Sequence, residues 1–105
     1  MVRRWSMGKP SSSSRSADRI AVNVRASGGG HVAEVTVRDR EITSHRVRVS
    51  RAERERYGTE DIAVLVTRSF EFLLARESNT SILREFDLST IERYFPEYAR
   101  EIVPR

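Results

Sequence analysis

Cysteine is absent from the 105 residues of the chain, and this absence excludes disulfide bonds and thiolate metal sites. No apolar run approaches the roughly 20 residues that a membrane-spanning helix needs. Arg3 and Arg4 are not followed by an apolar stretch, so a secretory or twin-arginine signal is not expected. Together these absences predict a cytoplasmic protein without a membrane partner.

Lysine is nearly absent, since eighteen of the nineteen basic residues are arginine. Residues 1–19 carry five basic and one acidic residue, residues 20–56 carry eight and five, and residues 57–105 carry six and nine. The formal net charge of +4 therefore comes from the first half of the chain. Genome composition produces such an arginine bias as readily as phosphate binding does, so the basic charge alone is weak evidence for a nucleic-acid partner.

The motifs of common catalytic sites are also absent. No serine stands in a Gly-x-Ser-x-Gly arrangement. The acidic residues are spread along predicted helices, whereas a general acid and base must be held together in a cleft. The glycines at 28–30 lack phosphate-loop spacing and favour a hairpin turn. We therefore expect no enzyme activity and no cofactor.

His31 and His45 are the only histidines, and they lie on neighbouring predicted strands. A metal site needs three or four converging ligands, and only Glu34 is close to them in sequence. The alternation of the strands places both histidines on the buried face. Ordinary hydrogen bonds at strand ends are favoured over a metal pair or a general base.

The chain divides into a tail and one domain. Residues 1–18 contain four consecutive serines with glycine, proline and charged residues, which is typical of a disordered basic segment. Residues 19–105 carry the periodic apolar patterns of a single α+β domain.

Three strands are predicted after the tail, because apolar residues there recur at every second position. The turns between them, at residues 27–30 and 38–41, are short enough for antiparallel hairpins. Each strand thus has one buried and one exposed face. The buried positions are Ile20, Val22, Val24, Ala33, Val35, Val37, Val47 and Val49.

A short helix and a long helix are predicted next. Ser50 and Glu53 have the spacing of a capping box, which predicts a helix from Arg51 to Tyr57. Thr59 is the predicted cap of the long helix, whose apolar arc covers about half of its circumference. So wide an arc suggests burial by both the sheet and another helix. The arc contains Ile62, Ala63, Leu65, Val66, Phe70, Phe72, Leu73 and Leu74.

The C-terminal part follows a break at residues 78–81. The apolar residues of 82–86 predict a short helical turn, and Ser89 and Glu92 have capping-box spacing. A last helix follows, kinked or restarted at Pro96. Its apolar stripe consists of Ile91, Tyr94, Phe95, Tyr98 and Ile102. The predicted fold is therefore α+β, a three-stranded antiparallel meander followed by two main helices packed on one face (β-β-β-α-α).

The segment SILREFDL at 81–88, together with Ile91 and YFPEY at 94–98, resembles a C-terminal signature of small uncharacterised bacterial proteins. The span from residue 81 to residue 98 covers about a sixth of the chain. The resemblance implies no particular activity and assigns no functional residue.

Four arginines are predicted on the exposed face of the sheet: Arg25, Arg38, Arg46 and Arg48. Phosphate binding is one interpretation of this face. The other, which we favour, is a solvated surface whose charges discourage edge-to-edge aggregation. No predicted strand carries an aromatic residue, which argues against a sheet that stacks single-stranded RNA bases. Duplex binding through arginine remains open.

The aromatic stripe of the last helix has two interpretations as well. Tyr94, Phe95 and Tyr98 belong either to the core or to an interface, where tyrosine and phenylalanine are frequent anchors. The small valines of the sheet leave room for exposed aromatic surface, so we expect a homodimer or another protein partner. The leading hypothesis is a non-enzymatic protein-interaction module, such as a small bacterial accessory or antitoxin-like subunit. The alternative is a nucleic-acid-binding regulator that uses the arginine face and the basic tail.

Overall fold

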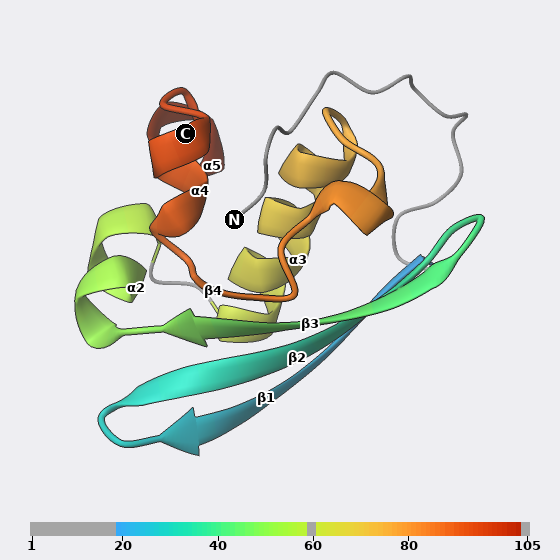
Figure 1. Cartoon of the computed structure of the whole chain (residues 1–105). Coiled ribbons are helices and arrows are strands. Elements are labelled where there is room, and N and C mark those ends of the chain that lie inside the picture. The colour runs from blue at the N-terminus through green and yellow to red at the C-terminus, as the bar shows by residue number, and fades with distance from the viewer. Residues whose placement is uncertain (1–18, 59–60, 104–105) are drawn as a thin grey trace.

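The computed structural model describes residues 19–58 and 61–103, in which a four-stranded sheet carries helices on one side (Figure 1). The predicted α+β class is therefore correct. The predicted disordered tail at residues 1–18 and the predicted helix cap Thr59 lie outside the described residues.

Strands β1 (Ile20–Ser27), β2 (Gly30–Arg38) and β3 (Ile42–Val49) form the predicted antiparallel meander. The turn between β1 and β2 uses Gly28 and Gly29, whose φ angles of 52° and 95° suit residues without a side chain. The glycine run is thus a hairpin turn, as its composition indicates.

A fourth strand, β4 (Glu85–Asp87), pairs with β3 in parallel, so the sheet is mixed and the predicted three-stranded sheet is incomplete. The predicted helical turn over residues 82–86 is wrong. A 3-10 turn, η1 (Asn79–Ser81), ends just before this segment, and strand β4 begins within it at Glu85. Backbone hydrogen bonds to β3 hold the strand, from the Arg46 N–H to the Arg84 carbonyl (2.7 Å) and from the Leu88 N–H to the Arg48 carbonyl (3.0 Å).

Helices α2 (Arg51–Tyr57) and α3 (Ile62–Leu74) follow the predicted pattern. Ser50 and Glu53 form the predicted capping box at the start of α2. Asp61 caps α3 by accepting a hydrogen bond from the Ala63 N–H (3.1 Å).

The C-terminal helices are α4 (Thr90–Tyr94) and α5 (Tyr98–Ile102), and Pro96 lies in the break between them, as a restart at proline predicts. The predicted capping box at Ser89 and Glu92 is not formed, because the Ser89 side chain makes no capping hydrogen bond. Glu92 instead binds residues of α2.

The core lies between the inner face of the sheet and the helices. Phe70 and Leu73 of α3 are fully buried against the sheet valines, of which Val47 is typical. Helix α3 contacts both β1 and α5, so its wide apolar arc is covered from two sides as predicted. Among the described residues, the opposite face of the sheet carries no helix, and it is called the outer face below (Figure 1).

Candidate functional site

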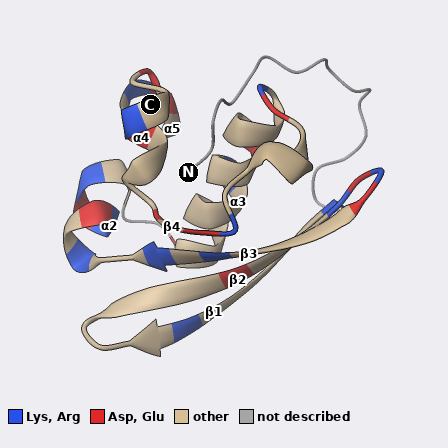
Figure 2. Ribbon diagram, viewed as in Figure 1, with Lys and Arg blue, Asp and Glu red and all other residues tan. Residues whose placement is uncertain are grey.

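The outer face of the sheet is the surface on which the sequence predicts a possible phosphate-binding site. The strand alternation sends Arg25, Arg46 and Arg48 to this face, as expected, because the flanking valines occupy the inner face. Figure 2 shows that acidic segments of β2 and β4 lie beside the basic segments of β1 and β3. The arginines are therefore interspersed with carboxylates.

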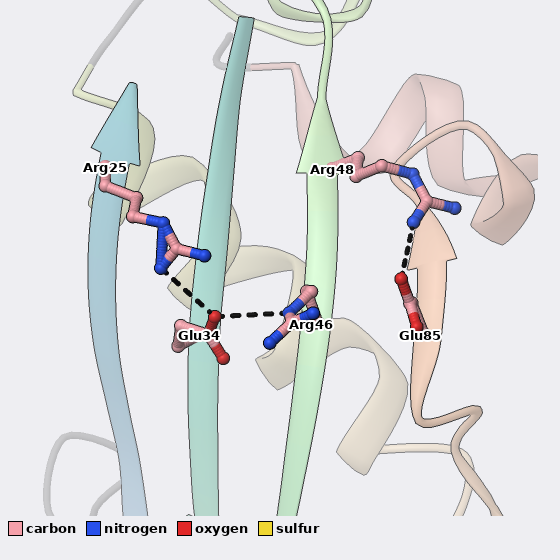
Figure 3. Close-up of polar contacts among 5 residues, drawn as sticks. All are labelled: Arg25, Glu34, Arg46, Arg48 and Glu85. Atoms are coloured by element: carbon pink, nitrogen blue, oxygen red, sulfur yellow. Dashed lines mark hydrogen bonds and ion pairs between the residues drawn. The ribbon is translucent and has the colours of Figure 1, made fainter. Parts of the chain in front are cut away.

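Glu34 is the centre of the first group of charges. It lies opposite Arg46 in the β2–β3 ladder, and its Oε2 accepts hydrogen bonds from Arg46 Nε (3.2 Å) and Arg25 Nη1 (3.3 Å). Figure 3 shows both arginines directed toward this carboxylate from the neighbouring strands. One acidic residue thus engages two of the arginines.

Arg48 is held by the two carboxylates of β4. Its Nε donates to Asp87 Oδ1 (2.7 Å), and its Nη1 donates to Glu85 Oε2 (2.8 Å; Figure 3). The hydrogen bond to Asp87 is the main reason that the pKa of Arg48 is raised. Sequence reasoning missed these partners because it treated the segment as helical. The polar–apolar alternation of Glu85, Phe86 and Asp87 is the signal that indicates a strand.

The charges in the middle of the outer face cancel. Three arginines (Arg25, Arg46 and Arg48) face three carboxylates (Glu34, Glu85 and Asp87), a sum of +3 and −3. This pairing lowers the positive potential with which the face could attract phosphate.

Arg38, the fourth predicted residue, lies at the far end of the ladder, opposite Ile42 rather than beside the other three. The turn that follows carries Asp39, which pairs with Arg19 (3.1 Å). The four arginines therefore do not form a single continuous cluster.

Tyr98 is buried in the core of the single chain, so it cannot be the interface contact that the sequence suggested. Its side chain is fully buried, with its ring 5.0 Å from the ring of Tyr57 and 5.2 Å from that of Phe72. Its hydroxyl forms a 2.7 Å hydrogen bond with that of Ser69, which also donates to the Leu65 carbonyl (2.8 Å). Ile91 and Ile102, which belong to the same apolar stripe, are buried as well.

Tyr94 and Phe95, the other two predicted contact residues, are half-buried. Phe95 packs edge-on against Phe72, with the ring centroids 5.8 Å apart. The guanidinium of Arg76 lies over the same Phe72 ring, 3.7 Å from its centroid. Much of the helical aromatic surface is thus covered by residues of the same chain, which weakens the case for an interface there.

Glu92 links helix α4 to helix α2. It accepts a hydrogen bond from the Tyr57 hydroxyl (2.6 Å) and three from the Arg56 guanidinium, two from Nη2 (both 3.0 Å) and one from Nε (3.3 Å). These bonds, led by that from Tyr57, lower the pKa of Glu92. Burial is the main reason that the pKa of Tyr57 is raised to about 12. Glu92 thus holds helix α4 against helix α2.

His45 is buried beneath the segment that leads to β4. Its Nδ1 lies 2.8 Å from the Leu83 carbonyl, which can only accept, so Nδ1 carries the proton. Its Nε2 then accepts from the Thr43 hydroxyl (2.8 Å). His31 lies four positions along β2 from Val35, the residue opposite His45, so the two histidines do not converge. His45 makes the ordinary hydrogen bonds that the sequence favours.

Within residues 19–58 and 61–103, no three acidic or histidine residues come together as metal ligands. No helix in the same ranges is both long and apolar enough to cross a bilayer. A hollow of about 360 Å³ lies beside the hairpin turn, lined by Gly29, Gly30, His31, Arg48 and Arg51 among others. Arg48, which lines this hollow beside the turn, is already paired with Glu85 and Asp87.

The two edges of the sheet differ in length and protection. Strand β4 forms one edge, with three residues, two of which are charged. Strand β1 forms the other edge with eight residues, without proline and with a single charged residue, Arg25. Short, charged strands are how proteins usually protect a sheet edge, so β4 is protected. The β1 edge is open in the sense that no strand within residues 19–58 and 61–103 pairs with its outer side.

Comparison of the chain with protein-family models, with curated proteins and with solved structures finds no match.

Proposed function

We propose that this chain is a non-enzymatic protein-interaction module, a small accessory or antitoxin-like subunit that binds another polypeptide. The observation that carries the proposal is the open edge of β1. Every second residue of an edge strand directs its backbone N–H and C=O groups away from the sheet, where an added strand can bind them. Eight residues offer enough of these groups for specific pairing.

The charges of the outer face support a protein rather than a nucleic-acid partner. A phosphate backbone would have to compete with Glu34 for Arg25 and Arg46, and with Glu85 and Asp87 for Arg48. Each displaced ion pair would leave a carboxylate facing the phosphates, which is unfavourable. Among the described residues, one strand carries an aromatic ring, Phe86 of β4, and this ring is buried on the inner face against Phe70. The other described aromatic rings lie in the helical layer, so no ring is placed to stack bases on the outer face.

The test is capture of partners by the tagged full chain from cells that naturally produce it, with and without nuclease. A protein partner that remains bound after nuclease treatment is the expected result. Hydrogen–deuterium exchange on the captured complex should then show slower exchange in β1 than in the free chain, because strand addition protects edge amides. Loss of every partner on nuclease treatment would contradict the proposal.

A second measurement addresses the nucleic-acid alternative directly. We expect the full chain to bind duplex DNA weakly at physiological salt, and Glu34→Gln to strengthen this binding because it releases Arg25 and Arg46 from their shared carboxylate. Sub-micromolar binding by the unmodified chain, abolished by Arg46→Ala with Arg48→Ala, would establish the alternative instead.

A further inference from the structure

We infer that the partner strand on the β1 edge is β1 of a second copy of the chain, paired antiparallel about a two-fold axis at Asn23. This inference rests on the proposed function, since it names the occupant of the same edge. The two four-stranded sheets would join into one continuous sheet of eight strands.

The two faces of β1 restrict how a strand can be added. Its inner side carries Val22 and Val24, which are only half-buried in the single chain although they pack against the core. Its outer side carries the exposed residues Ala21, Asn23 and Arg25. An added strand must therefore present apolar residues on the inner side and polar residues on the outer side, in alternation. β1 of a second copy has this pattern.

A two-fold axis perpendicular to the sheet keeps both helical layers on the same side. In an antiparallel pair, residues directly opposite each other share a face. The axis must therefore place one residue opposite the same residue of the second copy, because a register that paired it with its neighbour in sequence would oppose residues of different faces. The available centres within the strand's middle are Val22, Asn23 and Val24. These three registers differ in the residues that they bring together.

The register centred on Asn23 is the most favourable of the three. It places Val22 of each copy opposite Val24 of the other, so the four half-buried valines form one apolar row that continues both cores. On the outer side, Arg25 of each copy lies opposite Ala21 of the other, and the two Asn23 amides face each other. No like charges are opposed.

Each of the other two registers has a defect. Centring on Val22 places Arg19 of each copy opposite Arg25 of the other, which opposes like charges twice. Centring on Val24 places Val22 opposite the smaller Ala26 and leaves Ile20 opposite Gly28 in the hairpin turn. The sequence of β1 thus selects the Asn23 register.

One strand pair forms a small interface, so the dimer should dissociate on dilution rather than be permanent. Sedimentation velocity of the full chain over a wide concentration range is the first measurement. We expect the weight-average mass to rise from that of one chain toward that of two. A chain that sediments as a monomer at every concentration overturns the inference.

Adding a charge at Asn23, the residue at the axis, tests the register. In Asn23→Lys, and separately in Asn23→Asp, the two copies bring like charges directly opposite each other, and the dissociation constant should rise roughly 3- to 10-fold. Asn23 is exposed on the outer side, so neither variant disturbs the core. An equal mixture of the two variants should associate again, because Lys then faces Asp.

The matched control is Ser44→Lys, which adds the same charge to an exposed position of the outer face on β3, away from the edge. Its dissociation constant should equal that of the unmodified chain. The inference is overturned if Ser44→Lys weakens the dimer as much as Asn23→Lys does. It is also overturned if Asn23→Asp strengthens the dimer, since the Val24 register places this residue opposite Arg25.

Failure of self-pairing and failure of the proposed function give different results. A monomeric chain that captures another protein, with β1 protected from exchange in that complex, overturns self-pairing and leaves the interaction module standing. A monomeric chain that captures no protein removes both.

Discussion

The two faces of the sheet use polar side chains in opposite ways. On the outer face, Glu34 and its arginine partners keep between 38% and 58% of their side chains exposed. On the inner side, Ser69 is fully buried and His45 is 3% exposed, and both have hydrogen-bonding partners within 2.8 Å. The residues of the first group are charged and solvated, whereas those of the second are neutral and dry.

This difference determines what each group contributes. Water screens an exposed ion pair, which typically contributes well under 1 kcal/mol to stability, but the pair still sets the local potential. A buried polar group without its partner costs about 1–3 kcal/mol, because its desolvation is not compensated. The outer face should therefore control which partners bind, and the inner side should control whether the chain folds.

The largest expected effect is on the inner side, at Phe70. Phe70→Ala should lower the free energy of unfolding by about 3–5 kcal/mol, because it opens a cavity between α3 and the sheet where the side chain is fully buried. Urea denaturation measures this loss. Glu71→Ala, at an exposed position of the same helix, is the control and should cost less than about 0.5 kcal/mol. Equal losses would show that the face of α3 is wrongly assigned.

The next effect concerns the buried hydroxyl pair. Ser69→Ala should cost about 1–3 kcal/mol, since it leaves the Tyr98 hydroxyl buried without the partner that it has at 2.7 Å. Adding Tyr98→Phe to this variant should recover part of the loss, because the unpartnered hydroxyl is then removed. A double-mutant cycle that yields no coupling would contradict this assignment.

A smaller effect is expected from acid. Burial lowers the pKa of His45 from its ordinary value near 6.5, and the nearby Arg84 lowers it further. The unfolded chain therefore binds the proton more readily than the folded one, so stability is complete above about pH 6.5 and declines as the pH falls below it. The slope from one such group is at most about 1.4 kcal/mol per pH unit.

Denaturation curves at several pH values between 7.5 and 5 measure this decline. His45→Asn has no titrating ring but can still donate to the Leu83 carbonyl, so its stability should depend less on pH in this range. An unchanged pH dependence in His45→Asn would assign the acid sensitivity to another group.

The smallest effect is expected on the outer face. Arg46→Ala removes an ion pair to Glu34 that is half-exposed to solvent, and should cost less than about 0.5 kcal/mol. Thermal melts at low and high salt check this. A loss as large as that of Ser69→Ala would show that the outer face also contributes substantially to stability, and the contrast between the faces would fail.

Much of the sheet and of α3 could be predicted because local patterns carry the information. The alternation from Ile20 to Val49 and the arc from Ile62 to Leu74 reflect the periods of strand and helix. The capping box at Ser50 involves residues only three positions apart, so it too is readable locally.

The errors arose where a distant segment decides the outcome. Residues 85–87 form a strand because the edge of β3, about forty positions earlier, offers unpaired backbone groups. Ser89 and Glu92 have capping-box spacing, yet Glu92 binds Tyr57 and Arg56 instead, because α2 lies within reach. A local pattern contains no trace of these neighbours.

The sequence by itself determined the class of the fold, the two faces of each long strand and the turn at the glycines, because each follows from short-range periodicity and backbone sterics. Only the tertiary structure decided that Tyr98 is buried, that the arginines of the outer face are matched by carboxylates, and that β1 is the open edge of the sheet. These features depend on which segments meet in space, and β4 supplies two of the carboxylates only because it adds to β3.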